Sequence, residues 1–268
     1  MKIVVCIKQV PDTTNVEIDE ETGVLKRDHA AAKLNPFDTF ALETAFRIKE
    51  QYGGRITALT MGPPAARTAL LEAIYMGADD AVLLSDRRFA GADVVSTSYT
   101  LAQGISALGA VDLVICGKQT TDGDTAQVGP EIAEFLGIPH CANIIEMPII
   151  EHGDGARISH IVVKTAMETV LQAQKIALPC LIGMDRDILT PRLPSYLRKK
   201  QMGEAPIRTL TLDDLQDQDP EHYGLAGSPT QVERIFPPSS VRERNIVEGG
   251  AQELSDELMQ VLERFRLV

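Results

Sequence analysis

The sequence predicts an α/β protein with a Rossmann-like, doubly wound and mostly parallel sheet, and two observations support this class. Short apolar runs recur along the first half of the chain, and their apolarity is continuous rather than alternating, as in strands covered on both faces. Helix-like segments at 65–76 and 93–108 follow the second and third runs, and crossovers between parallel strands need that length. The runs lie at residues 3–7, 56–60, 81–84 and 111–116.

A hairpin and a helix are predicted between the first two runs. Residues 15–27 place apolar side chains on both sides of a Glu-Thr-Gly turn, which is typical of a surface hairpin. A helix is expected from about 37 to 52, because Asn35-Pro36 is a start signal and the glycine at Gly53 is a stop signal.

Beyond residue 139 the pattern changes to strand-like pieces that extend the same sheet, partly as added antiparallel strands. We therefore assign residues 1–185 to one α/β domain. The pieces lie at 144–150, 158–165, 169–171 and 179–184.

The C-terminal third differs in composition from this domain. From 186 to 248 periodicity weakens and Pro, Asp, Gln and Ser accumulate, so an arm without a core of its own is predicted. A closing helix then carries one apolar stripe that must be buried on this domain or on a partner. The stripe consists of Leu254, Leu258, Val261, Leu262 and Phe265.

Charge and hydropathy exclude several classes of protein. The chain of 268 residues has 26 basic and 38 acidic side chains, a net charge of −12, so we expect no nucleic-acid partner. An anionic membrane surface would repel the chain as well, and no apolar stretch approaches the roughly 18 residues of a membrane span. We expect a cytoplasmic protein with no membrane partner.

Catalytic and metal motifs are missing from the sequence. The cysteines at 6, 116, 141 and 180 and the five histidines have no metal-ligand spacing, and no Gly-x-Ser-x-Gly elbow occurs. We therefore predict no catalytic residue and no metal site. If electrons or hydride move here, a cofactor must carry them.

Four loops are predicted to meet at one rim of the sheet, because each follows a parallel strand. They span 8–11, 61–64, 85–93 and 117–130. Ligands of open α/β sheets bind at this edge, where the first N–H groups of a helix attract phosphate oxygens. The last loop, Gly-Lys-Gln-Thr-Thr-Asp-Gly-Asp-Thr-Ala-Gln-Val-Gly-Pro, follows a strand and leads into a helix, so it is predicted to hold phosphate.

The polar groups of this loop have distinct expected roles. Asp122 and Asp124 would repel phosphate oxygens, so they accept ribose hydroxyls, brace the loop or cap the helix. The helix amides from about Thr125 onward are expected to hold a pyrophosphate, with Gly129 allowing close backbone approach. The hydroxyl of Thr125 and the amide of Gln127 are further polar contacts.

Two other rim loops carry candidate residues with simpler alternatives. Gly62 permits a ligand to approach the backbone, although a plain strand-to-helix turn explains it equally well. Asp93 is the N-cap of the following helix, with contact to a ligand as the second interpretation. The rim by itself is also compatible with an AMP- or ATP-holding sensor or a nucleotide-hydrolysing relative.

The residues resemble the beta subunit of electron-transfer flavoproteins along nearly the whole chain. The motifs that carry the resemblance are Lys-Ile-Val-Val-Cys-Ile-Lys-Gln-Val-Pro at 2–11, Leu-Asn-Pro-Phe-Asp at 34–38, Met-Gly-Pro at 61–63, Met-Gly-Ala at 76–78, the 117–130 loop and Pro-Arg-Leu-Pro-Ser at 191–195. The resemblance implies a subunit that pairs with a flavin-bearing alpha subunit and holds an adenine nucleotide at the rim. Residues 1–185 would then be the nucleotide-binding domain, and 186–268 a docking loop, arm and C-terminal helix that pack on the alpha subunit.

The form of the loop at 122–130, together with Phe-Ala-Gly-Ala-Asp at 89–93, resembles the electron-bifurcating branch of that family. This implies FAD at the rim rather than the structural AMP of ordinary members. NADH would be the hydride donor, with one electron passing through the alpha-subunit FAD to an acyl-CoA or other flavin dehydrogenase. The other electron would pass to ferredoxin or flavodoxin.

The resemblance also implies which residues contact the cofactor, mostly through backbone groups. They are Cys6, Asn35, Pro36, Phe37, Asp38, Met61, Gly62, Gly91, Asp93, Gly117, Gln119, Asp122, Gly123, Asp124, Thr125, Ala126, Gln127, Val128, Gly129 and Pro130.

The 191–198 segment matches the loop by which family members dock on partner dehydrogenases, and Leu193 stands at the anchoring leucine. Tyr196-Leu197 departs from the expected smaller aliphatic pair, and the usual lysine-rich continuation is short.

Overall fold

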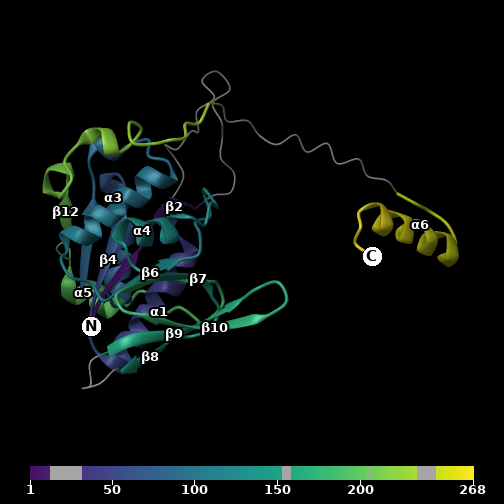
Figure 1. Ribbon diagram of the computed structural model, residues 1–268, viewed down its shortest axis with the longest axis horizontal. Coiled ribbons are helices and arrows are strands. Elements are labelled where there is room, and N and C mark those ends of the chain that lie inside the picture. The colour runs from purple at the N-terminus through teal and green to yellow at the C-terminus, as the bar shows by residue number, and fades with distance from the viewer. Residues whose placement is uncertain (13–31, 153–157, 204, 206, 234–245) are drawn as a thin grey trace. The chain divides into compact units, whose positions relative to one another are not determined.

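The computed structural model describes residues 1–12, 32–152, 158–203, 205, 207–233 and 246–268 (Figure 1). The hairpin predicted at 15–27 lies outside the described residues. By contacts the chain divides into Met1–Glu233 and Arg234–Val268. The first unit contains the sheet and the second contains the closing helix.

The first unit is built on a ten-stranded mixed sheet in the order β10-β9-β7-β11-β6-β1-β4-β5-β12, with β8 paired to β9. Neighbouring strands from β7 to β12 along this order are parallel, and the pairs made by β9 are antiparallel. The strands are β1 Lys2–Cys6, β4 Arg55–Met61, β5 Asp80–Leu84, β6 Leu113–Gly117, β7 His140–Ile144, β8 Ile149–His152, β9 Ile158–Ala166, β10 Leu171–Ala177, β11 Cys180–Met184 and β12 Arg208–Leu210. The predicted fold class is confirmed.

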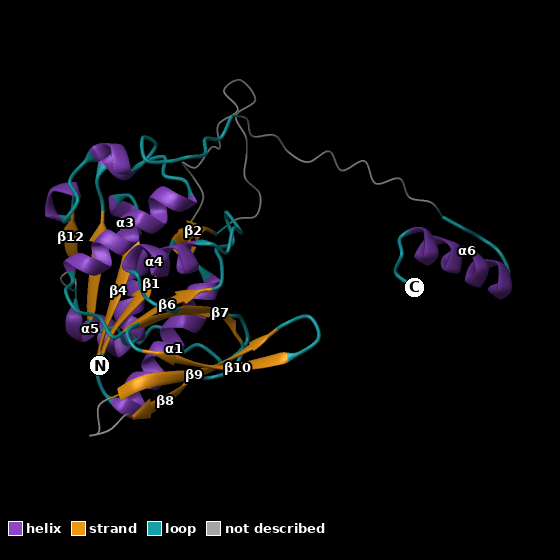
Figure 2. Cartoon of the chain, viewed as in Figure 1, coloured by secondary structure: helices purple, strands orange, loops and turns teal. Residues whose placement is uncertain are grey.

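Helices cover both faces of this sheet (Figure 2). One core cluster packs α1 and α2 against alternate strand residues such as Ile3 and Val5, and a second packs α3 and α4 against Val4 and Leu59. Burial on both faces is why the strands are continuously apolar. The longer helices are α1 Pro36–Tyr52, α2 Arg67–Met76, α3 Val94–Ala107, α4 Val128–Leu136, α5 Tyr196–Met202 and, in the second unit, α6 Ala251–Arg264.

Short elements complete the first unit. A separate two-stranded sheet pairs β2 with β3, next to the start of α1. The short elements are β2 Gln9–Pro11, β3 Ala32–Leu34 and the 3-10 turns η1 Pro64–Ala66, η2 Arg87–Phe89, η3 Leu212–Asp214 and η4 Pro220–His222.

The start signals of two helices are confirmed, and one is corrected. Asn35 and Asp93 are the N-caps of α1 and α3, as expected. The helix expected from about Thr125 begins only at Val128, because Asp124 and Ala126 adopt left-handed backbone angles, φ 57° and 58°, that a right-handed helix cannot contain.

Two predicted strands are also corrected. The piece at 144–150 is two strands, because β7 ends at Ile144 and β8 begins at Ile149. Pro148 lies between them and has no N–H to donate to a ladder. Of the piece at 169–171 only the last residue is in a strand: β10 runs from Leu171 to Ala177, and 169–170 belong to the turn that precedes it.

The stretch after residue 186 shares the core of the sheet domain. β12 adds a parallel strand beside β5, and Leu210, Leu212, Leu215 and Tyr223 are buried in the cluster that contains α3. Its apolar residues show neither helical nor strand periodicity, because they pack individually against the core formed by the sheet and α3.

One polar cluster fixes this stretch to α3. Asp217 accepts hydrogen bonds from the Tyr99 hydroxyl at 2.6 Å and from His222 Nδ1 at 2.6 Å, and its carbonyl accepts one from Tyr223 at 2.6 Å. The hydrogen bonds, with that of Tyr99 the largest, lower the pKa of Asp217 to about 2. The same carboxylate raises the pKa of His222, with Asp219 and Glu221 adding to the effect.

We expect the attachment of this stretch to weaken as pH rises. Because the pKa of His222 is raised in the folded state, its ionic contribution is complete below about pH 6.5 and is lost as pH rises through the folded value. Hydrogen exchange of residues 217–228, corrected for intrinsic rates, should therefore quicken with pH in the wild type and less so in His222→Gln. His140→Gln, an exposed histidine on β7, should behave as wild type. Equal pH dependence in all three proteins would contradict this assignment.

The second unit contains α6. Its apolar stripe is partly exposed, with Leu258 at 59% and Phe265 at 65%. Packing of this helix on an alpha subunit stays a prediction. No helix in the part of the chain that the structure describes has the length and apolarity to cross a membrane.

Candidate functional site

The carboxyl ends of the central strands meet at one edge of the sheet. Cys6 at the end of β1 is in register with Leu59 of β4 on one side and with Cys116 of β6 on the other. The loops that follow these strands therefore begin side by side. This places the 8–11, 61–64 and 117–130 loops at a common rim.

Asn35 links the start of α1 to two of these loops. Its backbone N–H donates to the carbonyl of Lys8 at 2.9 Å, and its Nδ2 donates to the carbonyl of Gln119 at 2.9 Å. Its Oδ1 accepts from the N–H of Thr121 at 3.3 Å. The side chain is completely buried and makes no capping hydrogen bond within α1. The residue that was part of the predicted start signal of α1 thus shapes the phosphate-loop candidate.

Asp38 lies beneath the same loops. Its Oδ2 accepts from the N–H of Lys8 at 2.7 Å, and Asn35 and the backbone of Gly117 also hydrogen-bond to it. Burial is the largest influence and raises the pKa of Asp38 to about 7, against the opposing hydrogen bonds and the charge of Lys8. The carboxyl group joins the ends of β1 and β6 to α1.

The raised pKa of Asp38 has a measurable consequence. The folded protein retains a proton that the unfolded chain releases above about pH 3.8, so the wild type should lose stability as pH rises from there to about 7. Asp38→Asn cannot ionise and removes this dependence. Between about pH 5 and about pH 8 the denaturant midpoint of the wild type should fall more than that of Asp38→Asn. If the difference in midpoint between the two proteins were the same at both pH values, the carboxyl of Asp38 would not be the buried, protonated group that we infer.

Gly117 is the most closely packed of the candidate glycines at the rim. A Cβ there would lie 2.5 Å from Asp38 Oδ1 and 2.8 and 2.9 Å from the carbonyl carbon and oxygen of Phe37. Glycine is therefore required where β6 leaves the sheet beside the start of α1.

The acidic residues of the 117–130 loop are held by the protein's own side chains. Lys8 Nζ donates to Asp122 Oδ1 and Oδ2 at 2.9 and 2.7 Å, and Gln119 Nε2 donates to Asp124. Burial acts to raise the pKa of Asp122, but the opposing hydrogen bonds from Lys8 and Thr120 outweigh it and hold the pKa below its usual value. These contacts correspond to one of the three expected roles of the two carboxylates, which is to brace the loop.

The end of this loop presents backbone groups to the rim. Thr125, Ala126 and Gln127 are exposed, and the side chain of Gln127 makes no capping hydrogen bond to α4. The first N–H groups of α4 are thus not satisfied by an N-cap side chain. Non-glycine residues with positive φ, here Asp124 and Ala126, are concentrated at ligand sites because their strain must be maintained by the surrounding structure.

The role expected for Gly129 is corrected by its surroundings. A Cβ at this position would contact Cys116 and Leu181 at 3.6 Å, so it would point at the sheet and not at a ligand. Gly129 brings α4 close to β6 and β11, and only its backbone N–H stays a predicted contact. Beneath it, a hydrogen bond with Cys6 and then burial raise the pKa of the Cys116 thiol well above its usual value, so the thiol stays neutral.

The outer candidates are occupied by protein contacts. Gly91 has φ 76° and a Cβ there would lie 3.2 Å from Leu225 Cβ, so it fits a turn against the 208–233 stretch. Asp93 Oδ1 accepts from the N–H of Ser96 at 3.0 Å, and Oδ2 accepts from Thr230 at 2.9 and 2.7 Å. These contacts correspond to the capping interpretation. A Cβ at Gly62 would lie 3.0 Å from Ala66 Cβ, as expected of a tight strand-to-helix turn.

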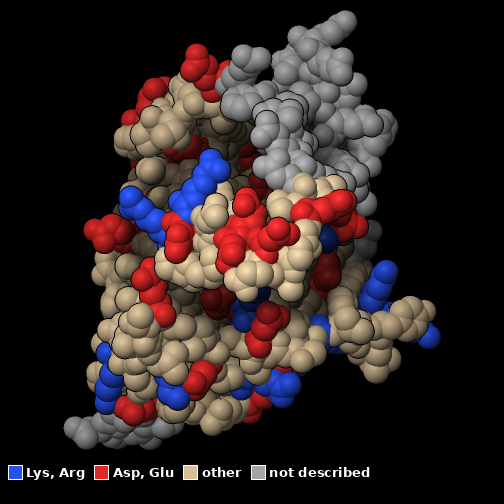
Figure 3. Space-filling model, turned by 90° about the vertical axis from the view of Figure 1, so that its right-hand side faces the viewer, with Lys and Arg blue, Asp and Glu red and all other residues tan. Residues whose placement is uncertain are grey.

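Lys8 is the rim residue that sequence reasoning missed as a site residue. It follows the first strand directly, and a basic side chain at that position was the available signal. The lysine within the loop, Lys118, is paired with Asp185 at 2.9 Å. Acidic side chains outnumber basic ones, 38 to 26, which gives the net charge of −12, and Figure 3 shows both kinds at the surface.

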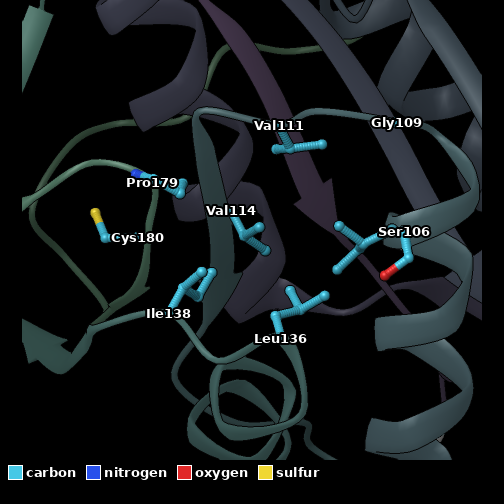
Figure 4. Close-up of a pocket in the computed structure, with 9 residues that line it drawn as sticks. Ser106, Gly109, Val111, Val114, Leu136, Ile138, Pro179 and Cys180 are labelled. Atoms are coloured by element: carbon cyan, nitrogen blue, oxygen red, sulfur yellow. The ribbon is translucent and has the colours of Figure 1, made fainter.

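A small pocket lies at the opposite edge of the sheet from the rim (Figure 4). Its volume is about 120 Å³, and apart from Ser106 its side chains are apolar or, at Cys180, a thiol, so it is unsuited to phosphate. No three potential metal ligands come together among the described residues. The pocket is lined by Ile105, Ser106, Gly109, Val111, Val114, Leu136, Ile138, Pro179 and Cys180.

Comparison with known proteins identifies the class to which this fold and rim belong. The family model for the electron transfer flavoprotein domain matches residues 22–215. The electron transfer flavoprotein subunit beta of Clostridium acetobutylicum is 43% identical over 234 residues, 87% of this chain and 87% of its own length.

Two further relatives are subunits of named reductases. Subunit CarD of the caffeyl-CoA reductase-Etf complex of Acetobacterium woodii is 42% identical over 241 residues, 89% of this chain and 88% of its own. The acryloyl-CoA reductase electron transfer subunit gamma of Anaerotignum propionicum is 38% identical over 272 residues, 97% and 98% of the two chains. The chain belongs to the electron transfer flavoprotein beta-subunit family.

Proposed function

We propose that this chain is the beta subunit of a heterodimeric, electron-bifurcating electron transfer flavoprotein. In this proposal the rim would hold FAD, which would supply the capacity to take hydride from NADH. One electron would reach an acyl-CoA or other flavin dehydrogenase through the FAD of the alpha subunit, and the other would reach ferredoxin or flavodoxin. The observation that carries the proposal is near full-length similarity to subunits of the caffeyl-CoA and acryloyl-CoA reductases.

The residues at the rim fit a dinucleotide. Uncapped N–H groups begin α4 at Val128 and Gly129, next to exposed backbone at 125–127. Helix N-termini of this kind bind phosphate oxygens. The carboxylates that would repel a pyrophosphate are engaged by Lys8 and Gln119.

In this proposal the chain supplies binding and orientation, and a bound FAD supplies the exchange between two-electron and one-electron steps. The 117–130 loop holds the phosphates through its backbone. Asn35 and Asp38 fix the shape of that loop, and the neutral thiol of Cys116 keeps the floor of the site uncharged.

The 191–198 segment is proposed to dock on the partner dehydrogenase. Leu193, Tyr196 and Leu197 are 86%, 79% and 61% exposed. The segment is nevertheless fixed: Ser195 N–H donates to the Tyr75 carbonyl at 3.0 Å, and Arg198 donates to two carbonyls of the α2 region at 3.1 Å. Exposed apolar side chains on a rigid support are suited to insertion into a partner's pocket.

The test is to purify the chain with its alpha subunit and to count flavins and AMP in each heterodimer. Two FAD per heterodimer are expected. One FAD with one AMP would instead indicate an ordinary, non-bifurcating beta subunit. Absence of flavin and of an alpha partner would overturn both and favour a nucleotide sensor.

A further inference from the structure

Lys8 is the residue through which three segments of the rim are joined. Its N–H donates to Asp38 at 2.7 Å, and its carbonyl accepts from Asn35 at 2.9 Å. Its ammonium group donates to both carboxylate oxygens of Asp122, at 2.7 and 2.9 Å. One residue therefore connects the end of β1, the start of α1 and the 117–130 loop.

The Asp122 end of this connection completes a set of restraints on the first half of the loop. Asn35 holds the carbonyl of Gln119 and the N–H of Thr121, and the ion pair holds the next residue. The N–H of Asp124 then donates to the Thr120 carbonyl at 3.0 Å as the chain enters its left-handed turn. These contacts restrain residues 119–124, and they therefore fix the position of the exposed backbone at 125–127 and of the first turn of α4, which follow directly.

The ion pair is placed where it affects charge as well as shape. The side chains of Lys8 and Asp122 are 44% and 31% exposed, so the pair lies at the surface of the rim. Without Lys8, Asp122 would present an uncompensated negative charge beside the proposed phosphates. Without Asp122, the loop would lose its ion pair with Lys8.

We propose that Lys8 and Asp122 form a clasp that positions the 117–130 loop for an adenine nucleotide and slows its release. Both are positioning residues in this assignment, which rests on the proposed function. The pair acts as a unit, so removing either partner has the same consequence. Because the clasp is a partly exposed ion pair, its effect decreases with salt.

The experiment uses the heterodimer with Lys8→Met, Asp122→Asn, the double variant and the charge exchange Lys8→Asp/Asp122→Lys. The rate of release of the bound adenine nucleotide is measured by dilution at low and at high salt. Each single variant should speed release by about 2- to 10-fold at low salt, with little further change in the double variant. The charge exchange should recover part of the loss, and high salt should bring wild type towards the variants.

Lys33→Met is the matched control. Lys33 is also 44% exposed and pairs with Asp12 at 2.8 Å, but it lies on β3 and contacts no part of the 117–130 loop in any hydrogen bond described above. This variant should release the nucleotide at the wild-type rate.

Two outcomes would overturn the clasp. Faster release from Lys8→Met with unchanged or slower release from Asp122→Asn would mean that Lys8 contacts a phosphate directly. Unchanged release from both would mean that the pair has no role. If the wild type carries no nucleotide, the proposed function fails, and hydrogen exchange of residues 117–127 still tests the clasp: faster exchange in both single variants supports it, and wild-type exchange overturns it.

Discussion

Gly117→Ala is expected to lower the free energy of unfolding by about 1–3 kcal/mol and to release the proposed nucleotide. The new methyl group would lie 2.5 Å from Asp38 Oδ1 and 2.8 Å from the carbonyl carbon of Phe37. The carbonyl carbon and oxygen of Phe37, at 2.8 and 2.9 Å, belong to the backbone of α1, which cannot rotate away. The buried carboxyl would have to move, and with it the hydrogen bonds that hold the ends of β1 and β6. Denaturant unfolding and nucleotide content of the heterodimer measure the two effects.

Gly123→Ala is the control within the same loop. A Cβ at Gly123 has Thr120 Oγ1 at 3.7 Å as its nearest neighbour, which is ordinary contact. Stability and nucleotide content should stay close to wild type. If both variants were equally stable, the close packing at Gly117 would not be the constraint that we infer.

Arg192→Met should have the second large effect, again about 1–3 kcal/mol of unfolding free energy. Glu43 on α1 has no exposed side-chain surface and accepts hydrogen bonds from Arg192 N at 3.1 Å, Nε at 2.8 Å and Nη2 at 3.0 Å. Burial acts to raise the pKa of Glu43, but the opposing hydrogen bonds, with Arg192 the principal donor, outweigh it and keep the pKa below its usual value. The variant leaves a buried carboxylate with Arg47 as its remaining guanidinium donor among the contacts described.

The loss should also be visible next to Leu193. Arg192 holds the 191–198 segment, proposed above to dock on a dehydrogenase, on α1 and lies over the Phe46 ring at 4.8 Å, so hydrogen exchange at 191–195 should quicken in the variant. Arg186→Met is the comparison, because Arg186 is 72% exposed and its pair with Asp187 spans 3.7 Å. That change should cost less than about 0.5 kcal/mol. Similar stability of the two variants would show that the Glu43 contacts contribute little.

The contacts around Arg192 bear on how the docking segment would work. An apolar tip held on a rigid support loses little conformational freedom on binding, and this favours affinity. The exposed Leu193 and Tyr196 would then be presented in one geometry to the proposed dehydrogenase.

Local signals in the sequence were enough for most of the secondary structure. Continuous apolar runs became β1, β4, β5 and β6, because strands buried on both faces need apolar residues at every position. The start of α1 was readable from Pro36, which suits a first helical turn, and that of α3 from Asp93, whose side chain caps an N–H three positions on. Local signals failed at α4, where left-handed angles at Asp124 and Ala126, neither of them glycine, delay the helix to Val128.

The sequence by itself determined the doubly wound sheet and the rim at which the 8–11, 61–64 and 117–130 loops meet, because strand burial and the direction of parallel strands follow from local pattern. Only the tertiary structure decided which side chains complete that rim. Lys8 meets Asp122 across 114 positions, and Asn35 meets the carbonyl of Gln119 across 84. Contacts at such separations depend on where the crossovers place each segment, so no local periodicity encodes them. The same holds for Gly117 and Gly129, which look alike in the sequence but face α1 and the sheet core respectively.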